Sequence, residues 1–167
     1  MIDNLVYNEK ITSNKTTGLF LGLTVVFLLF FIWRTYSVTL DTLGIIFLWF
    51  FVIFFFYTVN YRTLQVHITL ESVKLIYGMF SWKVPTENIE DCRLDDVPAL
   101  MRMGGAGIHF MFIRNRYRAS FNFLEYPRIV IGLKRKKGLV RDICFSTQRP
   151  DDILRCIREV SSLCTAA

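Results

Sequence analysis

Two clusters of basic residues have the spacing in this 167-residue chain that best suits binding chemistry. Arg114, Arg116 and Arg118 alternate along the sequence, so a β-strand through them would direct all three side chains to one face. The second cluster consists of four consecutive residues at an expected hairpin tip: Lys134, Arg135, Lys136 and Lys137. A cluster that faces a bilayer would bind anionic lipid headgroups, and one that faces away would bind an acidic partner. The alternative is that these charges only keep an exposed edge and a turn soluble.

A third candidate surface is apolar. Leu100, Met101 and Met103 lie in the irregular stretch Val97–Gly107. Methionine side chains adapt to the shape of what they contact. This loop therefore either contacts a partner or lies beneath the fold, and the sequence leaves both alternatives open.

Motifs for catalysis or for cofactor binding do not stand out. The run Gly104–Gly107 lacks the Lys-Ser/Thr of a phosphate-binding loop. His67 and His109 have no cysteine or carboxylate at metal-ligand spacing, and the four cysteines form no Cys-x-x-Cys pair. We therefore expect no enzymatic activity, no metal or cofactor, and free buried thiols.

The element that must position these residues is a pair of apolar blocks, Gly18–Trp33 and Leu43–Val59. Each block has no charged residue and, with its uncharged flanks, reaches the roughly 20 residues that cross about 30 Å of hydrocarbon as a helix. The segment between them is short, so the helices would be antiparallel neighbours. We expect a transmembrane helical hairpin over residues 17–61, preceded by a cytoplasmic segment (1–16) and followed by a cytoplasmic domain (62–167).

The distribution of charge indicates which side of the membrane the domain occupies. Lys10 and Lys15 precede the hairpin and Arg62 follows it, whereas Arg34 is the one basic residue in the turn. The positive-inside rule then places both termini in the cytoplasm, with the hairpin in the plasma membrane. The formal net charge of +6 agrees with a domain near anionic lipid. Nucleic-acid binding, which would use the same charge, is not expected of a membrane-tethered chain.

After Arg62 the apolar pattern changes to the period of a β-strand. Leu64, Val66 and Ile68 alternate with polar residues, as in a half-buried strand. Similar segments recur with short connections up to Thr147, which predicts an antiparallel meander of about seven strands. Pro150 and the acids that follow it are typical of a helix start, and apolar residues continue from there at helical spacing.

This order of elements resembles the pleckstrin-homology-like (PH-like) barrel, in the bacterial and archaeal branch that often follows one or two membrane spans. The similarity is carried by ITLESVKLIYGMFSWKVPTENIEDCRL (residues 68–94) and by PRIVIGLKRKKGLVRDICFSTQRPDDILRCIREV (residues 127–160). The resemblance implies an α+β domain: a seven-strand antiparallel barrel or sandwich capped by a C-terminal helix. It also implies a binding or assembly module without reaction chemistry.

Phosphoinositide binding, known in eukaryotic PH domains, does not carry over to this chain. Those relatives use basic residues in the loop between the first two strands, where this chain has Glu71-Ser72. We expect instead a membrane-anchored scaffold that assembles with itself or with other membrane proteins, with anionic lipid as a further ligand. The alternative is a small accessory subunit of a larger membrane enzyme or transport complex.

Overall fold

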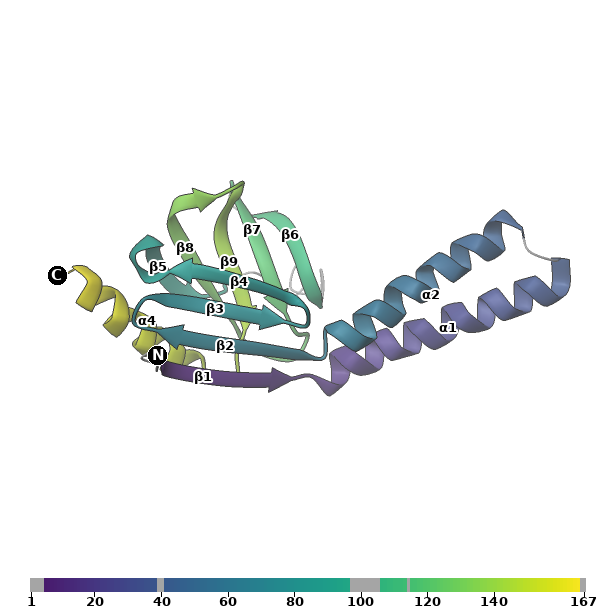
Figure 1. Ribbon diagram of the computed structural model, residues 1–167, viewed down its shortest axis with the longest axis horizontal. Coiled ribbons are helices and arrows are strands. Elements are labelled where there is room, and N and C mark those ends of the chain that lie inside the picture. The colour runs from purple at the N-terminus through teal and green to yellow at the C-terminus, as the bar shows by residue number, and fades with distance from the viewer. Residues whose placement is uncertain (1–4, 39–40, 97–105, 114, 166–167) are drawn as a thin grey trace.

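The computed structural model describes residues 5–38, 41–96, 106–113 and 115–165. Within these ranges, the side chains of residues 136–137 and 161–165 are not described. The chain forms a helical hairpin that projects from one end of a two-sheet α+β domain (Figure 1).

The hairpin consists of α1 (Asn14–Val38) and α2 (Thr42–Asn60). Both helices have polar N-caps, which satisfy backbone N–H groups that have no partner within the helix. The Ser13 hydroxyl accepts from the Thr16 N–H at 3.0 Å, and the Asp41 carboxylate accepts from the Gly44 N–H at 2.9 Å. Arg34 closes the far end of the hairpin with a 2.6 Å ion pair to Asp41.

The apolar surface of both helices is largely exposed. In the most apolar 18-residue stretch of each helix, only 17 % (α1) and 6 % (α2) of the stretch is buried. The helices contact each other through aromatic rings, as where Phe27 stacks on Phe50 and Phe54 with centroids 5.0 and 5.4 Å apart. Both helices are long and apolar enough to span a membrane, and their exposure differs from that of a soluble core helix.

The first sheet contains β1 (Leu5–Thr12), β2 (Thr63–Thr69), β3 (Ser72–Tyr77) and β4 (Phe80–Pro85), antiparallel and in chain order. The strand β1 leads directly into α1, and α2 leads directly into β2. These two strands pair, with Thr12 opposite Thr63 at the base of the hairpin. The helical hairpin therefore continues into the domain as a pair of hydrogen-bonded strands (Figure 1).

The second sheet follows a 3₁₀ turn, η1 (Thr86–Asn88). Its strands are β5 (Ile89–Leu94), β6 (Gly107–Ile113), β7 (Arg116–Asn122), β8 (Arg128–Lys137) and β9 (Val140–Ser146). Their order is β5-β8-β9-β7-β6, and β7 runs parallel to β9. The helix α4 (Pro150–Thr165) packs against β5 and η1.

The core lies between the two sheets and beneath α4. It combines alternate apolar residues of the strands with one face of the helix: Leu64, Val66, Leu75, Phe121, Ile131, Phe145, Ile153 and Ile157. The period-two pattern in β2 and the predicted start of α4 are confirmed, with Asp151 and Asp152 in the first helical turn.

Two features of the strand prediction are wrong. After Arg62 the described residues form eight strands rather than about seven, and these strands lie in two open sheets. The arrangement is not entirely antiparallel, because β7 and β9 are parallel. The segment before the hairpin, expected as an ordered or semi-ordered cytoplasmic lead-in, contributes a further strand, β1. Its strand pattern is weak because the buried position Glu9 is charged.

The junction between hairpin and domain is tightly packed at Gly78, in the turn between β3 and β4. Gly78 has φ +60°, and a Cβ atom there would clash with the backbone carbonyl oxygen of Asn60, the last residue of α2. Its own N–H donates to the Thr63 carbonyl at 3.4 Å. Glycine is thus required here both by conformation and by the approach of the helix end.

We predict that Gly78→Ala destabilises the protein more than Gly138→Ala. Gly138 also has a positive φ (+64°) but nothing lies within 4 Å of its Cβ position, so its substitution costs only the backbone strain of about 1–2 kcal/mol. The midpoint of thermal unfolding of the purified chain in detergent measures both. Equal losses in the two variants would contradict the tight junction.

Candidate functional site

The structure buries one of the predicted binding arginines. Arg118 is 3 % exposed and forms ion pairs with Asp95 at 2.9 Å and with Asp142 at 3.6 Å. Its charge is therefore compensated within the domain, and its side chain is not available to a headgroup or a partner in this structure.

Arg116 belongs to the same network. It pairs with Asp142 at 3.3 Å and with Glu90 at 3.5 Å. The shared contact with Asp142 confirms that Arg116 and Arg118 lie on one face, as their alternation predicts. Arg114 lies outside the described residues. The binding role of Arg116 stays a prediction. In this structure its charge is already compensated by two carboxylates.

The acids of this network come from strands far apart in the sequence. Asp142 on β9 lies between Arg118 on β7 and Gly132 on β8. Asp91 on β5 is opposite Gly132, and a side chain at Gly132 would occupy the position of the Asp91 carboxylate. Asp91 in turn pairs with Arg93. Arg93 and Arg118 both pair with Asp142, so the network joins β5, β9 and β7, and Gly132 on β8 leaves room for the Asp91 carboxylate.

Sequence reasoning missed these acidic partners, although a signal for them exists. Asp91 and Arg93 in β5, and Asp95 directly after it, alternate along the sequence, as Arg116 and Arg118 do along β7, so each set is expected on one face. Matching the two alternating sets would have indicated a cross-sheet ion network rather than a free basic face.

The same face carries buried groups that could in principle perform chemistry. The Cys144 thiol lies near Asn122 Oδ1 (3.6 Å) and Asp95 Oδ2 (3.9 Å), and burial raises its pKa to about 12. Burial and the nearby Arg128 lower the pKa of His109, so its ring is neutral at pH 7. A thiol with a raised pKa is a poor nucleophile. Among the described residues, no three His, Cys, Asp or Glu side chains are grouped to hold a metal ion.

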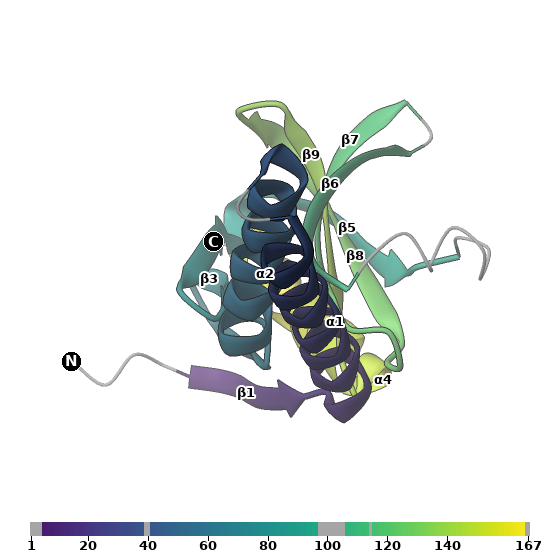
Figure 2. The same cartoon turned by 90° about the vertical axis from the view of Figure 1, so that its right-hand side faces the viewer.

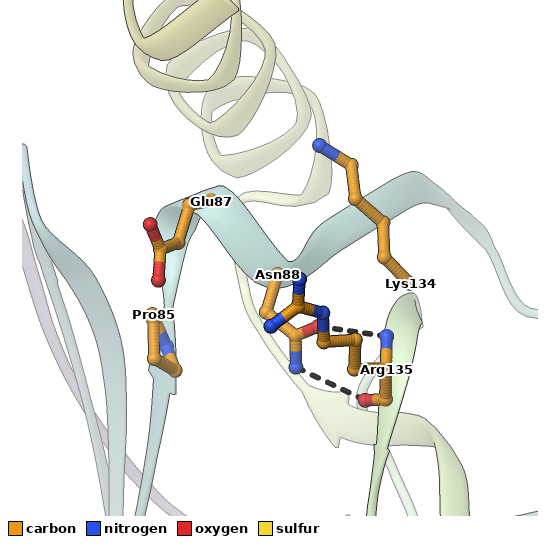
Figure 3. Close-up of a pocket in the computed structure, with 5 residues that line it drawn as sticks. All are labelled: Pro85, Glu87, Asn88, Lys134 and Arg135. Atoms are coloured by element: carbon orange, nitrogen blue, oxygen red, sulfur yellow. Dashed lines mark hydrogen bonds between the residues drawn. The ribbon is translucent and has the colours of Figure 1, made fainter.

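Lys134 and Arg135 of the second basic cluster line a polar hollow of about 300 Å³ (Figure 3). Its wall consists of Pro85, Glu87, Asn88, Lys134 and Arg135. The Asn88 side chain holds the β8 backbone in place, since its Nδ2 donates to the Arg135 carbonyl at 3.1 Å and its Oδ1 accepts from the Arg135 N–H at 2.8 Å. The hollow therefore has a fixed backbone floor beneath two exposed cations and one exposed acid.

The hollow lies at the end of the domain remote from the helical hairpin. Phe80, at the start of β4, has its ring 6.4 Å from Tyr61, which follows α2. Pro85, at the other end of the same strand, lines the hollow, and five steps of a strand span about 17 Å. Figure 1 accordingly shows β5, which follows η1, on the side of the domain away from the helices.

The remaining predicted site residues are not placed by the structure. Leu100, Met101 and Met103 lie outside the described residues. Lys136 and Lys137 are in β8, but their side chains are outside the description. Of the predicted binding residues, the structure brings together Arg116 with Arg118 and Lys134 with Arg135, as two separate groups.

Comparisons with known proteins give no match. The chain matches no protein-family model. Neither the search of curated proteins nor that of solved structures finds a similar protein.

We predict that Arg118→Met strongly destabilises the domain, whereas Arg135→Met does not. The first change removes the buried ion pair with Asp95 and one of the three arginines that pair with Asp142, and breaking a buried ion pair typically costs about 3–5 kcal/mol. The second removes an exposed charge of the same type. Thermal unfolding in detergent tests both variants, and a stable Arg118→Met protein would show that the buried ion pairs are dispensable.

Proposed function

We propose that this chain is a membrane-anchored scaffold whose helical hairpin crosses the membrane and whose two-sheet domain binds protein partners. The observation that carries this proposal is the direct continuation of α1 and α2 into the paired strands β1 and β2. Because no flexible linker separates anchor from domain, the domain keeps one orientation towards the bilayer. Confinement to a membrane also raises its effective concentration for membrane partners.

The pairing of β1 with β2 requires that both ends of the hairpin lie on the same side of the membrane. Lys10, Lys15 and Arg62 are on that side, and the charge of Arg34, near the opposite end of α1, is neutralised by Asp41. The positive-inside rule favours the cytoplasm for the domain, and the plasma membrane of a prokaryotic cell is the proposed location.

We further propose that the domain is a divergent PH-like module. Two packed sheets followed by a C-terminal helix support this assignment. The additional strands and the parallel pair β7–β9 are departures from the expected seven-strand barrel. The proposal implies binding without catalysis.

The partner surface that the geometry favours is the hollow beside Lys134 and Arg135. It faces away from the hairpin, so headgroups of the bilayer that anchors the chain are out of its reach. A carboxylate side chain of a partner protein, or of a second copy of the chain, would pair with Lys134 or with Arg135. The alternative function, an accessory subunit of a larger membrane complex, is favoured by the exposed aromatic side chains of α2, such as Trp49 and Phe55.

We predict that Lys134→Glu/Arg135→Glu releases protein partners that the unaltered chain retains after gentle detergent extraction. The matched control is Lys74→Glu/Lys83→Glu, which changes the same charge at two exposed, neighbouring positions on the first sheet. Affinity purification from native membranes with quantitative mass spectrometry measures the partners and their stoichiometry.

Equal loss of partners from both double variants would indicate general electrostatic attraction and contradict the assigned surface. Retention of all partners by both variants would also contradict it. Recovery in a fixed ratio with one large complex, without self-association, would favour the accessory subunit.

A further inference from the structure

The domain exposes a group of large apolar side chains at the end from which the helices leave. We call this group the β4–β6 aromatic face, and it consists of Met79, Phe80, Phe110 and Phe112. These residues are between 45 % and 69 % exposed, and none is charged. An exposed cluster of this kind on a soluble surface typically marks an interaction site.

The β4–β6 aromatic face is continuous with the end of the hairpin. Tyr57, in the last turn of α2, lies 4.9 Å from Tyr61, and Tyr61 lies 6.4 Å from Phe80 (ring centroids). Figure 1 shows β6 crossing the hairpin end of the domain, and Figure 2, viewed from the helices, shows the β6–β7 hairpin extending beyond them to one side. If the hairpin spans a membrane, this face lies at the level of the bilayer surface.

An apolar hollow of about 300 Å³ opens within this face. Aromatic rings supply most of its wall, which includes Tyr61, Phe80, Trp82, Ile108, Phe110 and Phe121. The two sheets meet here, because Phe80 and Trp82 belong to β4 and Ile108 and Phe110 belong to β6. The size and lining suit a segment of hydrocarbon chain.

We propose that the β4–β6 aromatic face binds membrane lipid, with its rings in the interfacial layer and a lipid acyl chain in the hollow. This inference rests on the proposed crossing of the membrane by the hairpin. Aromatic side chains are enriched at the membrane–water interface, and the hairpin holds this face permanently beside that layer. The edge position of β6, which pairs with β7 alone among the described strands, is compatible with an interface where water and headgroups satisfy backbone groups.

The three tryptophans of the chain provide the test. Trp82 lines the hollow, and Trp49 lies exposed in the middle of α2. The full chain is reconstituted into phosphatidylcholine vesicles whose acyl chains carry bromine, which quenches tryptophan on contact. Trp33→Phe/Trp49→Phe leaves Trp82 as the sole fluorophore, and Trp33→Phe/Trp82→Phe leaves Trp49.

We predict that Trp82 and Trp49 both lose emission in brominated vesicles relative to unbrominated ones. Emission loss from Trp49 with none from Trp82 would overturn lipid binding by this face while leaving the membrane anchor intact, and would point to a protein partner there. No loss from Trp49 would overturn the anchor itself and this inference with it.

Two further variants control for the position of the reporter. Adding Phe110→Ser and Phe112→Ser to the single-Trp82 chain should reduce its quenching, because it removes the exposed rings that hold the face at the interface. Leu70→Trp, in a chain with the three native tryptophans changed to Phe, places a reporter in the β2–β3 turn at the far end of the domain and should show no loss. If the reporter in the β2–β3 turn were quenched as strongly as Trp82, this result would contradict a specific lipid-binding face.

Discussion

The pairing of β1 with β2 is the constraint on which the rest of this structure depends. These strands flank the helical hairpin, so their hydrogen bonds fix the distance and direction of both helix ends. Buried Glu9 ties β1 to the segment that precedes α4, because its carboxylate accepts hydrogen bonds from the Thr147 hydroxyl at 2.7 Å and from the Gln148 N–H at 2.9 Å. Tyr126 adds a hydrogen bond from its hydroxyl to the Thr12 carbonyl at 2.9 Å. The helical hairpin and the domain therefore form one unit rather than two tethered parts.

The two ends of the domain differ in their surface chemistry. The end beside the hairpin is apolar and aromatic, whereas the opposite end carries the polar hollow of Lys134 and Arg135. The middle of the second sheet is occupied by compensated charges around Asp142, which pairs with Arg93, Arg116 and Arg118. The proposed functions follow this order, with lipid at one end and an acidic protein segment at the other.

The sequence predicted the elements whose pattern is local and failed where the partner is distant. Uninterrupted apolar blocks indicated α1 and α2, and alternation indicated β2. The strand β1 was missed because its partner lies beyond the hairpin and because Glu9 interrupts its apolar alternation. Burial of Arg118 could not be read from β7 alone, since Asp95 and Asp142 approach it only when β5, β8 and β9 assemble beside each other. The polar hollow likewise requires Asn88 to meet Arg135 across two segments.

The central claim is that the hairpin and the domain have one fixed relative orientation, and a distance measurement between them tests it most directly. Spin labels at Tyr36, exposed near the end of α1, and at Leu70, in the β2–β3 turn, would report on it by double electron–electron resonance in lipid bilayers. The native cysteines would first be replaced. The account predicts a single narrow distance distribution. A broad or multimodal distribution would show that the domain moves freely on its anchor and would contradict it.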